Sequence, residues 1–166
     1  MRAGEQASLD WYGFGDLTAA LLYDVLAFRQ GIFVVEQCCA YPDLDGLDQR
    51  AQHLLLRVGG ALAGCLRLVP DEGRVKIGRV AVAPTLRRQG LAWLLMMEAL
   101  DRCRRDFADC TVALSGQTYL APLYETLGFA VTSAPYDDYG LSHVDMILRS
   151  PDPRHPGTAE GRARDP

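Results

Sequence analysis

Two arginines, a glutamine and a glycine stand together at Arg87–Gly90, immediately before an apolar run that begins at Leu91. If a helix starts there, its first backbone N–H groups have no intrahelical partner and carry partial positive charge, so they favour an anion. Gly90 has no Cβ and lets the backbone approach a ligand closely, while Arg87 and Arg88 can add bidentate hydrogen bonds to phosphate oxygens. These residue types in this order predict a phosphate-binding loop.

An ordinary solvated helix start is the alternative interpretation of the same residues. Basic side chains near a helix N-terminus oppose the helix dipole unless an anion joins them, and this misfit favours the phosphate site. The run "GGALAG" at 59–64 does not predict a second phosphate loop, because no Lys-Ser/Thr follows it and a strand comes next.

The elements before this loop alternate in type. Apolar periodicity predicts a strand at 8–13, a helix from a cap at Asp16 or Thr18 to about Arg29, and a short helix at 32–35. The next stretch, "CAYPDLDGLDQR", is expected to be a loop because its proline, glycine and aspartates oppose regular structure.

A meander of three strands follows that loop. Paired glycines at 59–60 join two apolar runs and predict a hairpin of strands 53–58 and 61–69, because glycine supplies the positive φ of a tight turn. The third strand, 74–82, changes its apolar face midway. Its apolar residues are first odd-numbered, Val75 and Ile77, and then even-numbered, Val80 and Val82. Either both faces of this strand are buried, or a bulge lies near Gly78 and Arg79.

The remaining elements complete an α/β pattern. They are a helix at 91–105, a strand at 111–115, a short helix at 119–127 ended by Gly128, and strands at 129–133 and 143–149. This order predicts a three-layer fold with a mixed, mostly antiparallel central sheet and helices on both faces. We expect residues 1–150 to form one domain and the tail 151–166, which has no apolar periodicity, to be disordered.

Composition disfavours several classes of function. The chain has 166 residues with 17 basic and 21 acidic side chains, a net charge of −4, which argues against a nucleic-acid partner. No apolar run approaches the roughly 20 residues that span a bilayer, and the N-terminus lacks the apolar core of a signal peptide. We therefore expect a cytoplasmic monomer or homodimer that binds neither nucleic acid nor membrane.

The five cysteines are expected to be reduced. Their number is odd, and no pair has C-x-x-C spacing. A metal site built from Cys38, Cys39 and the three histidines is the alternative, but the usual zinc spacings are missing, so we expect no metal.

The phosphate loop resembles that of a known superfamily. Arg87–Ala92 fits Arg/Gln-x-x-Gly-x-Gly/Ala, the acetyl-CoA pyrophosphate loop of the GNAT N-acetyltransferases, and the preceding "GRVAVAP" is similar to the strand that leads into it. "LYETLGF" at 123–129 resembles the later Tyr-Glu-x-x-Gly-Phe signature. The loop alone is weakly specific, but strand, loop, helix and signature stand in the superfamily's order.

Four further stretches resemble the ElaA-like branch of this superfamily: "FVVEQCCAYPDLDGLD", "HLLLRV", "LSGQ" and "GLSHVDMIL". The resemblance covers Leu9 to Arg149. Ser142 stands where the family usually has proline, and Ala92 stands where glycine is commoner.

The resemblance implies direct transfer of an acetyl group from acetyl-CoA, as cosubstrate, to an amine. It assigns the cofactor loop to Arg87, Arg88, Gln89, Gly90, Leu91 and Ala92. It also implies that the backbone N–H of Val82, with Val80 and Ala81 nearby, polarises the thioester carbonyl. The adjacent strand would splay away, so that Leu114, Ser115 and Gln117 face the pantetheine arm.

Tyr124 is the candidate general acid, because a phenol is protonated at neutral pH and can give its proton to a departing thiolate. Its place in the resembling signature favours that role. The helical pattern alone favours a core position, since Leu120, Leu123, Tyr124 and Leu127 share one helical face.

The general base is left open among Glu36, His53 and His143. Glu36 lies between an apolar run and the acidic loop, and each histidine begins an apolar strand, where a capped or core histidine is the alternative. The loop aspartates at 43, 45 and 48 could attract a cationic amine or form a solvated turn. A non-catalytic domain that binds acyl-CoA for regulation is the alternative function, and it would need neither acid nor base.

Overall fold

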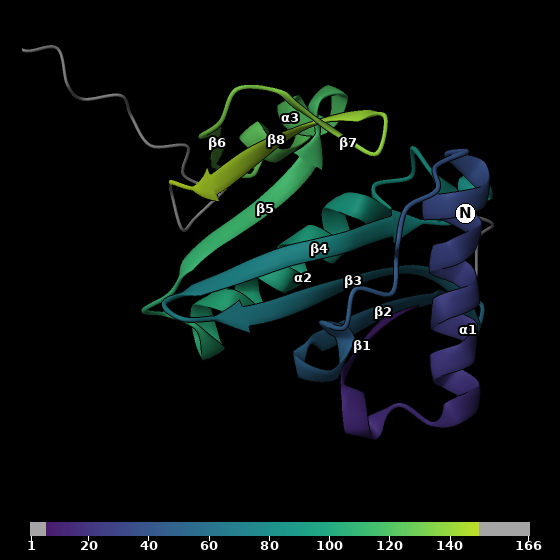
Figure 1. Cartoon of the computed structure of the whole chain (residues 1–166). Helices are drawn as coiled ribbons and strands as arrows, with labels where there is room; N and C mark the ends of the chain where they lie inside the picture. Colours follow the sequence, from purple (N-terminus) through teal and green to yellow (C-terminus); the bar gives the residue numbers. More distant parts are fainter. Residues whose placement is uncertain (1–5, 150–166) are drawn as a thin grey trace, which may run out of the picture.

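The computed structural model describes residues 6–149 as eight strands and three α-helices (Figure 1). The strands are β1 Ala7–Gly13, β2 Gln52–Val58, β3 Ala61–Asp71, β4 Arg74–Val82, β5 Thr111–Gln117, β6 Phe129–Val131, β7 Tyr136–Asp138 and β8 Leu141–Leu148. The helices are α1 Ala19–Gln30, α2 Leu91–Asp106 and α3 Ala121–Thr126, and a π-helical turn, Gly31–Glu36, continues α1.

All eight strands form one sheet in the order β1-β2-β3-β4-β5-β8-β6, with β7 paired to β8. Only β4 and β5 run parallel among these pairs, and the other neighbours are antiparallel. The predicted mixed, mostly antiparallel sheet is thus confirmed. The tail predicted to be disordered lies outside the described residues.

Most element boundaries agree with the sequence. Thr18 is the N-cap of α1, and its Oγ1 accepts a hydrogen bond from the N–H of Leu21 at 3.2 Å. Two details differ. β7 was not predicted, and the helix expected over 119–127 is divided into a 3-10 turn at Thr118–Leu120 and α3.

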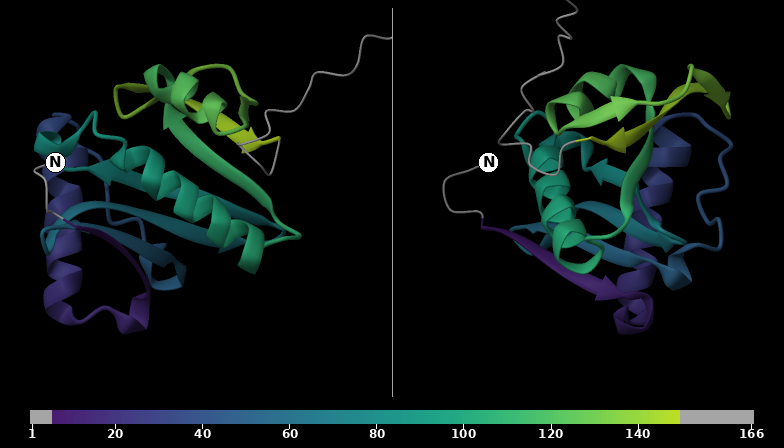
Figure 2. Two further views of the ribbon diagram at one scale, coloured as in Figure 1. Left: turned by 180° about the vertical axis from the view of Figure 1, so that it is seen from behind. Right: turned by 90° about the vertical axis from the view of Figure 1, so that its left-hand side faces the viewer.

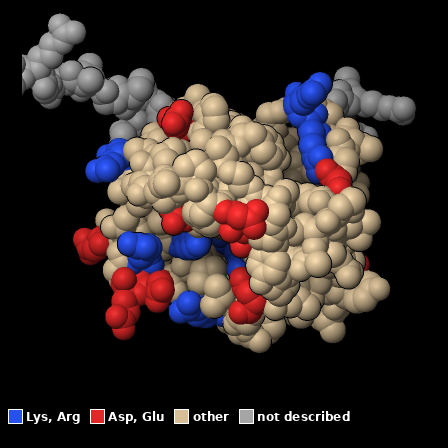
Figure 3. All heavy atoms as spheres, turned by 45° about the horizontal axis from the view of Figure 1, so that its top comes forward, with Lys and Arg blue, Asp and Glu red and all other residues tan. Residues whose placement is uncertain are grey.

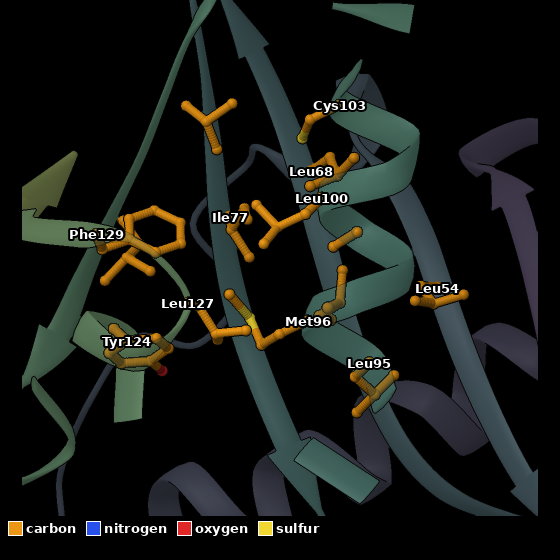
Figure 4. Close-up of a cluster of buried hydrophobic side chains, with 14 of the residues drawn as sticks. Leu54, Leu68, Ile77, Leu95, Met96, Leu100, Cys103, Tyr124, Leu127 and Phe129 are labelled. Atoms are coloured by element: carbon orange, nitrogen blue, oxygen red, sulfur yellow. The ribbon is translucent and has the colours of Figure 1, made fainter. Parts of the chain in front are cut away.

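Helices cover both faces of the sheet, with α2 and α3 on one side and α1 on the other (Figure 2). The larger core lies on the α2 side, where Met96 and Leu100 meet Leu54, Leu68 and Ile77 of the sheet (Figure 4). The smaller core lies beneath α1. It contains Val25, Ile32, Leu55, Cys65 and Ala81. No helix within residues 6–149 is long and apolar enough to cross a membrane.

A bulge in β4 explains the change of apolar face seen in the sequence. Gly78 pairs with Arg67 and Ala81 pairs with Cys65, so Arg79 and Val80 together lie opposite one residue of β3. The bulge alternative is therefore confirmed. Pairing of β4 with β5 ends at Ile77 and Leu114, directly before the bulge, and the two strands diverge beyond it (Figure 1).

Candidate functional site

The gap between the diverging ends of β4 and β5 contains a backbone donor. The Ala83 N–H donates to the Ala63 carbonyl at 2.8 Å, toward β3. Successive strand residues direct their backbone groups to opposite sides, so the N–H and C=O of Val82 face the gap. The Val82 carbonyl accepts a hydrogen bond from Arg87 Nε at 3.1 Å on that side. Of its neighbours, Val80 packs against the larger core, and Ala81 is buried in the smaller one.

The loop after β4 returns to this end of the strand through the contact of Arg87 with the Val82 carbonyl, and it leads into α2. Gly90 is the N-cap of α2 with φ 78°, and Arg88 also has a positive φ of 62°. A Cβ built on Gly90 would meet nothing within 4 Å, so the space beside this N-cap is open. The first N–H groups of a helix have no intrahelical partner. Leu91 is buried and anchors the helix, while Arg88 and Gln89 are exposed. Orphan donors, exposed cations and open space suit an anionic group such as a pyrophosphate.

Arg87 connects this loop to the π-helical turn. Its Nη1 and Nη2 donate to the two carboxylate oxygens of Glu36 at 2.6 and 2.8 Å. These hydrogen bonds lower the pKa of Glu36 and outweigh the opposing effect of burial. A carboxylate held in this way is a weaker base than a free one. The structure therefore places the candidate base Glu36 beside the loop before α2, where it is bound to Arg87.

The side chain of Tyr124 extends from α3 toward β5. Its ring packs edge-on against Phe129, with 6.2 Å between ring centroids, and the side chain is buried (Figure 4). Burial, and then the nearby Tyr119, raise the pKa of Tyr124 to about 12. The hydroxyl therefore stays protonated at neutral pH and can donate a hydrogen bond. The ring occupies the core position that the helical pattern predicts, and the role of its hydroxyl is a separate question.

A glycine in β5 makes room for the Tyr124 ring. A Cβ on Gly116 would lie 2.7 Å from Tyr124 Cε2, closer than real Cβ contacts allow. We expect Gly116→Ala to lower the free energy of unfolding by about 1–3 kcal/mol, because the buried ring must shift in a packed core. Urea unfolding measures this loss.

Gly78→Ala in β4 is the matched control, since its added Cβ would meet nothing within 4 Å. We expect this variant to be as stable as the parent or slightly more stable, because alanine restricts the unfolded chain. Equal unfolding free energies for the two variants would show that Gly116 does not accommodate the ring.

The two candidate histidines lie in different places. His53 of β2 is 2% exposed on the α1 side, with Nε2 3.0 Å from the Asp48 carbonyl, and burial lowers its pKa. Two strands separate it from β5. His143 of β8 pairs directly with Gln117 of β5 and stacks on Tyr136, so it lies beside the end of β5 but on the side away from β4. Gln117 in turn donates to Gln37 Oε1 at 3.3 Å, which joins the end of β5 to the segment after the π-helical turn.

A cluster of three arginines and three aspartates lies on the α1 side of the sheet. Six contacts connect the cluster: Arg29 with Asp43 and Asp48, Arg67 with Asp45 and Asp48, and Arg79 with Asp43 and Asp45. Acidic and basic side chains also adjoin on the face shown in Figure 3. Of the two alternatives for these aspartates, the solvated turn is wrong for Asp43 and Asp48, which are buried. The paired guanidinium groups also neutralise the carboxylates, so the loop offers no excess charge for a cationic amine.

Only part of this cluster was visible in the sequence. The aspartates stand out there, but their partners do not. An arginine within an apolar strand, as in "CLRLV" and "IGRVAV", is the available signal, because a buried guanidinium requires acidic or carbonyl partners.

Asp45 gives the stability of this cluster a predictable pH dependence. Burial raises the pKa of Asp45, but hydrogen bonds from Arg67 and from the Leu47 N–H outweigh it and bring the pKa down to about 2. A carboxyl whose pKa is lowered in the fold contributes stability above its unfolded pKa of roughly 3.9, and that contribution is lost as the pH falls toward 2. We expect the unfolding free energy of Asp45→Asn to vary less steeply than the parent's between pH 4 and 2. Parallel curves from urea titrations would contradict this assignment.

The cysteines are free thiols in the described structure. Cys38 is exposed, whereas Cys39 is buried and donates to the Tyr139 carbonyl at 3.3 Å. Burial raises the pKa of Cys65 and of Cys103 to about 12, so both remain protonated thiols, as small core side chains do.

Comparison with known proteins identifies the family. Residues 33–150 match the profile of the acetyltransferase (GNAT) domain. The chain belongs to this family. It is 41% identical over 138 residues to a UPF0039 protein of Schizosaccharomyces pombe, covering 81% of this chain and 92% of that protein.

Two solved structures of GNAT-fold proteins extend the comparison. Escherichia coli ElaA has a TM-score of 0.82 at 30% identity, covering 87% of this chain and 100% of ElaA. A Pseudomonas aeruginosa acyl-CoA N-acyltransferase has a TM-score of 0.81 at 36% identity, covering 86% of this chain and 99% of that structure. The resemblance to the GNAT superfamily and its ElaA-like branch is thus confirmed.

Proposed function

We propose that this chain transfers an acetyl group from acetyl-CoA directly to an amine. The observation that carries the proposal is the gap between β4 and β5. The Val82 backbone faces the side that β5 leaves, and Arg87, three residues before the N-cap of α2, donates to the Val82 carbonyl there. The similarity to the Pseudomonas aeruginosa acyl-CoA N-acyltransferase adds support. Acetyl-CoA, when bound, supplies the activated acyl group.

The proposed cofactor contacts follow the order of the chain. The N–H groups at Gly90, Leu91 and Ala92 bind the pyrophosphate, and Arg88 adds charge from the rim. The Val82 N–H donates to the acyl carbonyl and stabilises the negative charge that develops on its oxygen. Arg87 and Gln89 complete the loop, and Arg87 can reach a phosphate only by loosening its contacts with Glu36.

The proposed acid is Tyr124. With a pKa near 12 its hydroxyl is a weak acid that stays protonated at neutral pH, so it can donate a hydrogen bond to the leaving sulfur as charge develops there. Glu36 and His143 are the bases we propose for the incoming amine, because Glu36 contacts Arg87 of the loop after β4 and His143 pairs with Gln117 at the end of β5. His53 is the least favoured of the three candidate bases, since it lies on β2 and its Nε2 is hydrogen-bonded to the Asp48 carbonyl.

Consumption of acetyl-CoA across a panel of amines and peptides tests the function. We expect thiol release that depends on one class of amine, with the acetylated amine detected by mass spectrometry. Tight binding of acetyl-CoA without turnover on any amine would instead favour the non-catalytic, regulatory domain.

A further inference from the structure

Arg79 occupies a position in the β4 bulge that normally requires glycine. Its φ is 54°, in the left-handed region, and the first residue of this kind of bulge is usually glycine because a Cβ is strained there. The residue that follows it, Val80, is the extra residue opposite β3. A non-glycine residue in this conformation is strained, and contacts of its side chain can offset that cost.

The acidic loop supplies that hold. Arg79 Nε donates to Asp43 Oδ1 at 2.6 Å, and Nη2 donates to the Asp43 carbonyl at 2.9 Å and to Asp45 Oδ2 at 3.0 Å. The guanidinium also lies over the Tyr41 ring, 4.8 Å from its centroid. Three charge-assisted hydrogen bonds and a stacked ring together hold this side chain in place.

The bulge determines where the Val82 N–H points. β4 pairs with β5 up to Ile77, turns at Arg79, and then presents Val82 to the gap two residues after the extra one. A shift of one residue in the register would exchange the sides to which the backbone groups of β4 point. The backbone at Arg79 therefore controls the donor that the proposed function requires.

We infer that Asp43 and Asp45, acting through Arg79, are positioning residues for the acyl-CoA site. This inference rests on the proposed function. It gives the segment "YPDLD" a role in shaping the gap, although Asp43 precedes Arg79 by 36 residues in the sequence. The loop itself does not contact the substrate in this proposal. It stabilises β4, the strand that carries the Val82 N–H.

A comparison of glycine and alanine at position 79 tests the inference. Both substitutions remove the guanidinium, and in both Asp43 keeps Arg29 while Asp45 keeps Arg67. Glycine adopts a positive φ without strain, whereas alanine does not. In the ligand-free chain we expect the Ala83 amide to exchange with solvent about fivefold faster in Arg79→Ala than in Arg79→Gly. Calorimetry is expected to show weaker acetyl-CoA binding for Arg79→Ala by a similar factor.

Arg74, an exposed residue of the same strand, provides the control pair. Glycine is disfavoured in regular strands. The Ala83 amide is therefore expected to exchange faster in Arg74→Gly than in Arg74→Ala, which is the reverse of the order at position 79. If Arg79→Ala does not fold, Arg79→Gln replaces it, because glutamine has the same difficulty with a positive φ.

The possible outcomes separate this inference from the proposed function. Equal exchange rates and equal affinities for the two variants at position 79, in a parent that binds acetyl-CoA, would overturn the inference alone. A parent that does not bind acetyl-CoA would overturn the proposed function, and with it the role of the bulge in a cofactor site, even if the exchange rates differ as expected.

Discussion

Gly90→Glu is expected to abolish acetyl-CoA binding. The new carboxylate would project from the N-cap of α2 into the open space that we assign to the pyrophosphate, where it adds both bulk and negative charge. It would also occupy the N–H groups that the phosphate oxygens need. Isothermal titration calorimetry on parent and variant measures the loss directly.

Two further substitutions at Gly90 divide this effect into its causes. Gly90→Ala introduces only the strain of a side chain at φ 78°, since its Cβ meets no neighbour within 4 Å. We expect it to destabilise the fold by about 1 kcal/mol and to weaken binding modestly. Gly90→Gln matches glutamate in size without its charge and is expected to bind more tightly than Gly90→Glu. Parent-like binding by Gly90→Glu would place the cofactor elsewhere.

Tyr124→Phe is expected to lower turnover by roughly ten- to a thousandfold, the contribution of a general acid. The ring, its packing on Gly116 and its edge-on contact with Phe129 are retained, so only the hydroxyl is lost. Acetyl-CoA affinity should hardly change, because the hydroxyl matters chiefly when negative charge develops on the sulfur. We expect the unfolding free energy to change by no more than about 1 kcal/mol.

The pH dependence of turnover provides an internal check on this role. A pKa of about 12 keeps Tyr124 protonated through pH 10, so its ionisation should not limit the parent between pH 8 and 10. Unchanged turnover in Tyr124→Phe would make this tyrosine a core residue only. Protonation of the leaving group would then fall to water or to another side chain.

Local signals explain why much of the fold could be predicted. The switch from Val75 and Ile77 to Val80 and Val82 predicted either a bulge or a strand buried on both faces, because strand side chains alternate with a period of two, and the structure has the bulge. The apolar spacing of residues 91–105 likewise identified α2. β7 escaped prediction because its three residues, Tyr136–Asp138, are mostly exposed and show no apolar alternation.

The contacts that complete the candidate site are long-range, and no local pattern encodes them. Glu36 and Arg87 are 51 residues apart, and Arg29 reaches Asp48 across 19 residues. Which carboxylate meets which guanidinium depends on how strands and loops come together in the fold. The role of Gly116 was hidden for the same reason, since only the folded chain brings Tyr124 against it.

A crystal structure of the chain with acetyl-CoA would show directly whether the cosubstrate binds between β4 and β5. We expect the pyrophosphate at the N–H groups of Gly90, Leu91 and Ala92, and the acyl carbonyl oxygen within hydrogen-bonding distance of the Val82 N–H. We also expect the pantetheine arm to lie between β4 and β5, near Gln117. Acetyl-CoA bound away from the gap, or bound there with its carbonyl directed away from Val82, would show that the proposed acetyl-CoA site is wrong.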